Sequence, residues 1–275
     1  MAEFSKTNAE QTLAHFRENG WMRVQHAFDD EAGAAMRDAV WAVLAQAGIA
    51  RDRPDSWTVE RPAHLQRLKA DPAFLAVGSE TLLAAIDAVL EGRAYEPPKD
   101  WGGFFLAFPT ATPWAIPTAG WHIDANYLSP LWPAGGVKTF TLLDDVEPRG
   151  GGTLMVSGSH RLVHRWFREN PPPAGTRSGE MRKLLQAHPY VGGLHEAGDP
   201  DARIARFMAR AEEHDGIPLQ VVETVGAAGD VILAHPLLLH VAAPNNAAKP
   251  RFLLSGGVTL DGWGWDSVQA SLRTG

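Results

Sequence analysis

The feature that most limits the fold is the sequence pattern from Gly102 onward, where short apolar runs alternate with Gly, Pro and Asp. Apolar runs of this length, bounded by turn residues, are typical of β-strands. We expect strands at residues 104–108, 137–143, 153–156, 220–224, 231–234 and 252–260. Many short strands separated by turns favour a barrel or jelly roll over alternating β-α-β units.

The N-terminal part of the chain has a helical pattern instead. Thr7 and Glu10 fit a capping box, which predicts a helix that ends near Asn19, just before Gly20. A short strand at residues 21–24 follows, and apolar residues at helical spacing predict further helices at about 29–48 and 80–90. The predicted architecture is therefore mainly β with flanking helices, with an N-terminal helical layer packed on a jelly-roll core.

A long segment, residues 165–217, interrupts the β pattern. It contains three consecutive prolines, several glycines and two helix-like stretches, at about 179–188 and 201–214. An insertion of this length in a β core is more often a lid or binding loop than a separate domain. We therefore predict a single domain over residues 1–275, composed of the helical layer at about 1–100, the β core at about 102–164 and 218–262, and the lid-like insertion.

Composition excludes several classes of function. The chain has no Cys, which rules out disulfides, thiolate nucleophiles and Cys-ligated metal sites. Its formal charge of −7 argues against nucleic acid and against a polybasic membrane anchor. The polar start does not resemble a signal peptide and no long apolar run predicts a membrane span, so we expect a cytoplasmic protein. The many Trp and Phe suit either a small-molecule pocket or an ordinary core.

One His-x-Asp triplet, His122-Ile123-Asp124, is a candidate metal site. In an extended segment side chains alternate, so the imidazole and the carboxylate point to the same face and can reach one ion. On the triplet alone, a hydrogen-bonded His–Asp surface pair is the favoured interpretation. His240, at the end of an apolar stretch, supplies a third ligand, and Arg251 follows eleven residues later. Two His and one carboxylate leave coordination positions open, as in non-haem Fe(II) oxygenases, and Arg binds carboxylates bidentately.

These residues resemble those of the phytanoyl-CoA dioxygenase family of Fe(II)- and 2-oxoglutarate-dependent oxygenases. The resemblance rests on His122-x-Asp124, on the spacing from His240 to Arg251, on the segment from Gly151 to Arg161 and on the N-terminal Phe16-Arg17-Glu18-Asn19-Gly20-Trp21. It implies a double-stranded β-helix (a jelly roll, cupin-like) with Fe(II) held by His122, Asp124 and His240. It also implies 2-oxoglutarate as cosubstrate on Arg251, O2 as oxidant, and no catalytic residue beyond the metal centre.

The chain departs from the family pattern at three positions. Ile123 stands where a Gln is frequent, Ala242 replaces a hydroxyl residue, and Phe140 stands where the founding member has a Trp that contacts the cosubstrate. We expect Phe140 to keep an apolar wall, and Thr139, Asn126 or Lys138 to replace the lost hydrogen bonds. Related halogenating enzymes have Ala or Gly at the carboxylate position, so Asp124 favours hydroxylation.

The expected partner is a small organic substrate, and no pattern indicates an oligomeric state. Aromatic and polar residues near the triplet or the C-terminus are candidates to line the mouth of the site: Trp101, Phe104, Phe108, Trp114, Trp121, Asn126, Trp263 and Trp265. Basic residues around the insertion either form a solvated face or bind an anionic substrate: Arg161, Arg165, Arg168, Arg177, Arg182 and Lys183. Two other functions stay open, a cupin-like metalloenzyme that does not use 2-oxoglutarate and a non-catalytic β-barrel ligand-binding protein.

Overall fold

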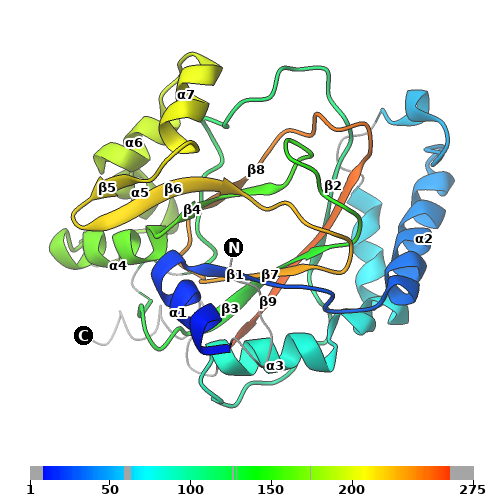
Figure 1. The fold of residues 1–275 in the computed structure, drawn as a ribbon, viewed down its shortest axis with the longest axis horizontal. Coiled ribbons are helices and arrows are strands. Elements are labelled where there is room, and N and C mark those ends of the chain that lie inside the picture. The colour runs from blue at the N-terminus through cyan, green and yellow to red at the C-terminus, as the bar shows by residue number, and fades with distance from the viewer. Residues whose placement is uncertain (1–8, 59–62, 126, 128, 174, 261–275) are drawn as a thin grey trace.

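Two antiparallel sheets form the centre of the computed structural model, which describes residues 9–58, 63–125, 127, 129–173 and 175–260 (Figure 1). One sheet has the order β1 (Trp21–Val24), β7 (Val231–Ala234), β3 (Gly136–Leu142), β9 (Arg251–Thr259) and β2 (Gly103–Ala107). The other has the order β5 (Glu212–His214), β6 (Ile217–Glu223), β4 (Thr153–Ser157) and β8 (His240–Ala242). This pair of sheets confirms the predicted jelly roll.

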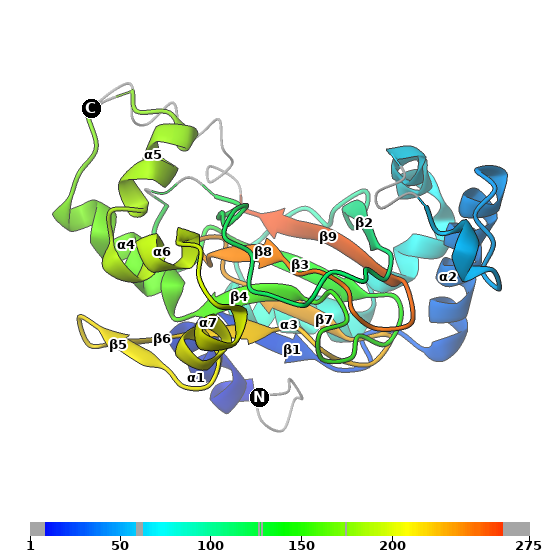
Figure 2. The ribbon, with the colours of Figure 1, turned by 90° about the horizontal axis from the view of Figure 1, so that it is seen from above.

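Helices cover the outer face of each sheet (Figures 1 and 2). The N-terminal layer, beside the first sheet, contains α1 (Ala9–Asn19), α2 (Asp30–Gln46), α3 (Glu80–Val89) and short 3-10 helices at Pro54–Ser56, Ala63–Ala70 and Pro72–Val77. The second sheet is flanked by α4 (Ser159–Glu169), α5 (Ser178–Leu185), α6 (Pro189–His195) and α7 (Pro200–Phe207). Side-chain caps fix several helix starts: Asp29 accepts from the Ala32 amide and Ser79 from the Leu82 amide.

Three apolar clusters hold these layers together. The largest joins the N-terminal helices to the outer face of the first sheet and includes Met36 and Ile86 from the helices and Met22 and Phe252 from the strands. A second joins the insertion helices to the outer face of the other sheet. The smallest, which includes Phe140 and Met155, lies between the two sheets. Because strand side chains alternate, each strand contributes one set of residues to an outer cluster and the other set to the space between the sheets.

The insertion differs from the prediction at its C-terminal end. The helix expected at 201–214 ends at Phe207, and residues 212–214 form β5, which pairs with β6. Asp215 and Gly216 join the two strands and both have positive φ, as a two-residue hairpin turn requires. An Asp-Gly pair is a strong hairpin signal, and the helical pattern that precedes it hides the strand.

The other predicted elements agree with the structure to within a few residues, whereas α4, α6 and the three-residue strand β8 were not expected. Thr7, the proposed cap of the first helix, lies outside the described residues. None of the described helices is by itself long and apolar enough to cross a membrane, and one bent pair, Pro72–Gly78 with Glu80–Val89, meets that test by length and composition only.

Candidate metal centre

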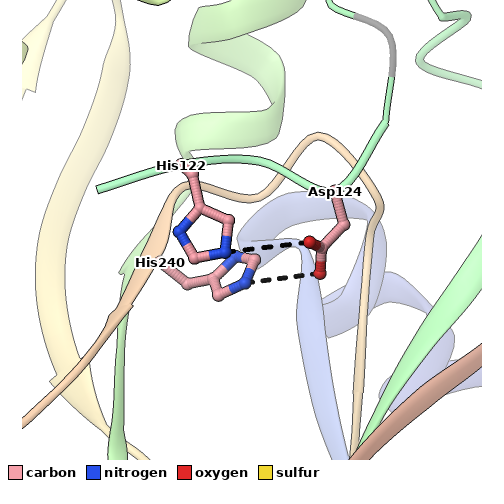
Figure 3. Close-up of side chains that lie close together, drawn as sticks. All are labelled: His122, Asp124 and His240. Carbon is pink, nitrogen blue, oxygen red and sulfur yellow. Dashed lines mark ion pairs between the residues drawn. The ribbon is translucent and has the colours of Figure 1, made fainter. Parts of the chain in front are cut away.

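Two side chains from one short segment, His122 and Asp124, meet the distant His240 between the two sheets (Figure 3). Nε2 of His122 lies 3.7 Å from Oδ1 of Asp124, and Nε2 of His240 lies 3.4 Å from Oδ2 of the same carboxylate. The potential ligand atoms of the three residues all lie within 4.8 Å of one another. The structure therefore brings together the three residues that the sequence nominates as metal ligands.

The backbone fixes the relative position of the two histidines. His122 and His240 form an antiparallel bridge, in which the His122 amide donates to the His240 carbonyl at 3.0 Å and the His240 amide donates to the His122 carbonyl at 2.9 Å. The Asp124 amide donates to the Pro236 carbonyl at 3.1 Å. The segment that carries His122 and Asp124 is thus hydrogen-bonded to the segment that leads into β8.

Each imidazole is also oriented by its second nitrogen. Nδ1 of His122 lies 2.7 Å from the Gly120 carbonyl, and Nδ1 of His240 lies 2.9 Å from the Leu238 carbonyl. A carbonyl only accepts, so in the neutral ring each Nδ1 carries the hydrogen and each Nε2 has a lone pair that faces Asp124. Metal-binding histidines are typically oriented in this way.

Burial and neighbouring charges shift the pKa values of His122 and Asp124 toward their metal-binding forms. Burial lowers the pKa of His122, and the nearby His240 lowers it further, which favours the neutral, ligating form. Burial alone would raise the pKa of Asp124. The adjacent His240, when it is protonated, and the ammonium group of Lys138 outweigh burial and hold the pKa of that carboxyl far below its ordinary value. The site therefore offers an ionised carboxylate at Asp124 and, at His122, a neutral imidazole nitrogen.

This donor set fits a divalent transition metal. Two imidazoles and one carboxylate form the set found in non-haem Fe(II) oxygenases, where three ligands on one side leave the other positions free for substrate and O2. The three groups lie on the wall of a cavity of about 230 Å³. The side chains thus fit a metal ion that keeps coordination positions facing open space.

Arg251 lies in the wall of the same cavity and is 4% exposed. Its Nε donates to the Gly151 carbonyl at 2.7 Å and one Nη donates to the Phe105 carbonyl at 2.9 Å, which fixes the plane of the guanidinium. A buried, oriented guanidinium is suited to a carboxylate. The Arg251 side chain therefore fits a carboxylate group bound in this cavity.

The two cosubstrate residues predicted beside Arg251 lie on opposite faces of β3. Phe140 lines the cavity, and its ring centroid lies 5.3 Å from that of His240. Thr139 points to the other face, toward the N-terminal helical layer, because strand side chains alternate. The structure does not bring Thr139 to the cavity. Lys138 does line it, and its Nζ lies 3.2 Å from Oδ2 of Asp124.

Most aromatic residues proposed for the substrate lie elsewhere in the molecule. Trp101, Phe104 and Phe108 belong to the cluster under the N-terminal helices. Trp114 and Trp121 are buried in the cluster under the insertion helices, where Trp121 donates to the Pro117 carbonyl. All five are core residues, so their expected place at the mouth of the site is corrected. Asn126, Trp263 and Trp265 lie outside the described residues.

Phe105, which no sequence pattern singled out, lines the cavity where Phe104 was expected. β2 presents Gly103 and Phe105 to the cavity, while Phe104 faces the N-terminal helices. The register of the pairing between β2 and β9 gives the signal, because Ala107 is opposite Arg251 and Phe105 is opposite Leu253, all on one face. Leu253 and Ser255 line the cavity for the same reason.

Two other histidines, His235 and His160, are buried away from the cavity. His235 and His160 pack against each other with ring centroids 5.1 Å apart. Nε2 of His160 lies 3.0 Å from the Arg17 carbonyl, on the side of α1. His235 donates to the Leu131 carbonyl. Both rings are therefore part of the packed interior and not of the candidate metal site.

Two solved structures have a fold similar to that of this chain. AviO1 from Streptomyces viridochromogenes Tue57 superimposes with a TM-score of 0.54 and 17% identity, over 94% of this chain and 97% of that one. The epimerase SnoN, solved with Fe3+, alpha ketoglutarate and nogalamycin RO, superimposes with a TM-score of 0.50 and 20% identity, over 93% of this chain and 85% of that one. No curated protein sequence matches.

At these identities the structural matches establish the fold alone. A family profile adds sequence evidence, since that of phytanoyl-CoA dioxygenase (PhyH) matches residues 16–253. The match spans the helical layer, the three candidate ligands and Arg251. This chain therefore belongs to the phytanoyl-CoA dioxygenase family.

Proposed function

We propose that this protein is an Fe(II)- and 2-oxoglutarate-dependent oxygenase that hydroxylates a small organic molecule. The observation that carries the proposal is the meeting of His122, Asp124 and His240 in a cavity that also contains Arg251. In this proposal the first three residues hold the metal and Arg251 binds the distal carboxylate of 2-oxoglutarate. Bound iron, with 2-oxoglutarate and O2, supplies the oxidising power for hydroxylation, and succinate and CO2 are released.

The protein's own share is ligation, orientation and exclusion of water. The carbonyls of Gly120 and Leu238 keep both imidazoles turned toward Asp124. Phe140 and Leu253 give the cavity apolar walls, which limit the water that reaches the reacting atoms. Ile123 and Ala242 offer no hydrogen bond to the cosubstrate, so Arg251 carries more of its recognition.

Arg251 separates this proposal from the two alternatives. A cupin-like metalloenzyme that does not use 2-oxoglutarate has no need of a buried guanidinium near its metal, and a non-catalytic binding protein has no need of the three ligands. Purified protein with Fe(II), ascorbate and O2 should convert 2-oxoglutarate to succinate. Iron binding without 2-oxoglutarate binding would favour the cupin-like enzyme, and binding of neither would favour the ligand-binding protein.

Two substitutions test the assigned roles separately. Arg251→Met should weaken 2-oxoglutarate binding about 10- to 100-fold, the range for losing a charge-assisted pair, and should leave Co(II) binding nearly unchanged. Asp124→Asn should weaken Co(II) binding more than about 100-fold, because changes to groups around a ligand already cost roughly 10–100-fold. His64→Asn, at an exposed position, is the matched control. Equal losses of both affinities in Arg251→Met would contradict these roles.

The reaction type needs its own test, since the similar structure SnoN is described as an epimerase. Asp124 keeps a carboxylate at the metal, which supports hydroxylation over halogenation. A compound that stimulates succinate formation should yield a product heavier by one oxygen atom. A product of unchanged mass, with an inverted carbon centre, would refute hydroxylation and leave the assignment of iron and 2-oxoglutarate intact.

A further inference from the structure

The cavity contains one positive charge that the proposed metal and cosubstrate do not require. The charges of a divalent ion and Arg251 are balanced by the Asp124 carboxylate and the two carboxylates of 2-oxoglutarate. Lys138 then adds an ammonium group to the same cavity wall. Among the described residues that line the cavity, Asp124 is the acidic one, so no second carboxylate balances Lys138.

This ammonium group lies close to the position of a bound ion. Nζ of Lys138 is 3.2 Å from Oδ2 of Asp124. A carboxylate oxygen ligates a metal of this kind at about 2.1 Å, so an ion on that oxygen would lie within roughly 5 Å of the ammonium. Two positive groups at this distance in a half-buried site repel each other. A nearby anion would relieve that repulsion.

Strand register places Lys138 at the opposite end of the cavity from Arg251. Lys138 is opposite Gly257 on β9, and Arg251 is the first residue of the same strand. Six residues of an antiparallel strand span on the order of 20 Å, and the side chains of residues 253 and 255 line the wall between them. A cosubstrate held by Arg251 approaches the metal from one end of the cavity, and Lys138 faces the metal from the other.

A second cation comes from the insertion. Met181 and Leu185 of α5 pack into the same apolar cluster as Ile123, which lies between His122 and Asp124. Arg182, exposed on this helix, lies near the side chain of Tyr127, and its charge is close enough to His122 to help lower the pKa of that imidazole. The insertion thus brings another positive group to the triad-bearing segment.

We propose that the substrate of this site bears an acidic group, a carboxylate or phosphate, that pairs with Lys138, with Arg182 as a second cation near the triad. The inference rests on the proposed function, because it assumes that the metal and 2-oxoglutarate occupy the rest of the cavity. In the absence of these ligands Lys138 pairs with Asp124. A metal on Asp124 takes over that carboxylate's charge, and the ammonium is then available to the substrate.

The test uses protein loaded with Zn(II) and 2-oxoglutarate, which bind without turnover, and matched pairs of small ligands. Each pair consists of an aromatic or aliphatic carboxylic acid, or a phosphate monoester, and its neutral amide or alcohol. Binding is followed by ligand-observed NMR. The acids and phosphates should bind in preference to their neutral partners, and separate carboxylate and phosphate sets show which group is favoured.

Variants assign the preference to individual cations. Lys138→Met keeps the apolar stem and should weaken the best acid at least tenfold, whereas Lys138→Arg should retain most of the affinity. Arg182→Met should have a smaller effect, and Lys183→Met, exposed on the same helix, is the matched control. Neutral partners that bind as well as the acids, or an acid preference that survives Lys138→Met, would overturn the proposal.

The same samples separate this inference from the proposed function. The affinity for 2-oxoglutarate is measured first, by calorimetry on the Zn(II)-loaded protein. Absence of that binding refutes the proposed function. Normal 2-oxoglutarate binding with no preference for acids refutes the acidic substrate alone.

Discussion

The buried His235 makes the stability of the fold sensitive to acid. This side chain is 2% exposed, and both ring nitrogens are engaged in the neutral form: Nε2 donates to the Leu131 carbonyl and Nδ1 accepts from the Leu237 amide. Burial lowers the pKa of His235 from 6.5 to about 4. Protonation would put a hydrogen on Nδ1, against an amide that already donates to it.

The size of the effect follows from the difference in pKa between the folded and unfolded chain. Between about pH 6.5 and pH 4 the unfolded chain binds a proton at His235 that the folded chain does not, so the free energy of unfolding falls as the pH falls. A difference of about 2.5 pKa units corresponds to about 3 kcal/mol. This contribution is fully present above pH 6.5 and is lost by pH 4.

The assay is urea unfolding of metal-free protein at a series of pH values from 7.5 to 4, followed by tryptophan fluorescence. His235→Asn removes the titrating group and keeps an acceptor for the Leu237 amide. Its destabilisation relative to the natural protein should shrink by about 3 kcal/mol across this range. The exposed His64→Asn should leave the profile of the natural protein in place. Parallel profiles for His235→Asn and the natural protein would refute the reasoning.

Three further predictions concern the core and the site. Phe104→Ala should lower the free energy of unfolding by about 3–5 kcal/mol in urea titrations, because Phe104 packs edge-on against Phe74 in the core. Phe105→Ala should lower it by less than about 1 kcal/mol, because Phe105 is 46% exposed. Equal losses of stability would contradict the assigned faces of β2. Asn245→Ala should lower the free energy of unfolding by about 3 kcal/mol in the same titrations, because the buried side-chain amide donates to the Ala107 and Lys249 carbonyls at 2.9 and 2.8 Å. A loss below about 1 kcal/mol would contradict this prediction, because it would mean that those carbonyls find other donors. Co(II) affinity should persist to lower pH than the ordinary histidine value of 6.5 implies, because burial lowers the pKa of His122; an affinity already falling at pH 7 would contradict this prediction.

The candidate ligands could be located from the sequence because local rules specify them. Side chains two residues apart on an extended segment share a face, which places His122 beside Asp124. The spacing from His240 to Arg251 spans one strand and the turn before the next, so both side chains reach the same space between the sheets. Neither argument requires knowledge of how the distant parts of the chain pack.

The lining of the cavity could not be predicted in the same way, because it depends on which face of each strand turns inward. A shift of one residue separates Phe104 from Phe105 and Thr139 from Lys138, and composition does not distinguish these faces, since both are apolar in β2. The register against β9 decides it. The strand β5 could not be predicted for a different reason: the helical pattern before it continues to the Asp215-Gly216 turn.

The backbone pair between His122 and His240 separates the metal-binding geometry from the segment that lies between them in the sequence. The helices α5, α6 and α7 all belong to that intervening stretch, yet the two histidines are joined directly by amide–carbonyl bonds. We therefore expect shortening, lengthening or exchanging these helices to change the spacing of the imidazoles little. A chain of this design can vary the helices around the candidate metal site while the three candidate ligands keep their relative positions.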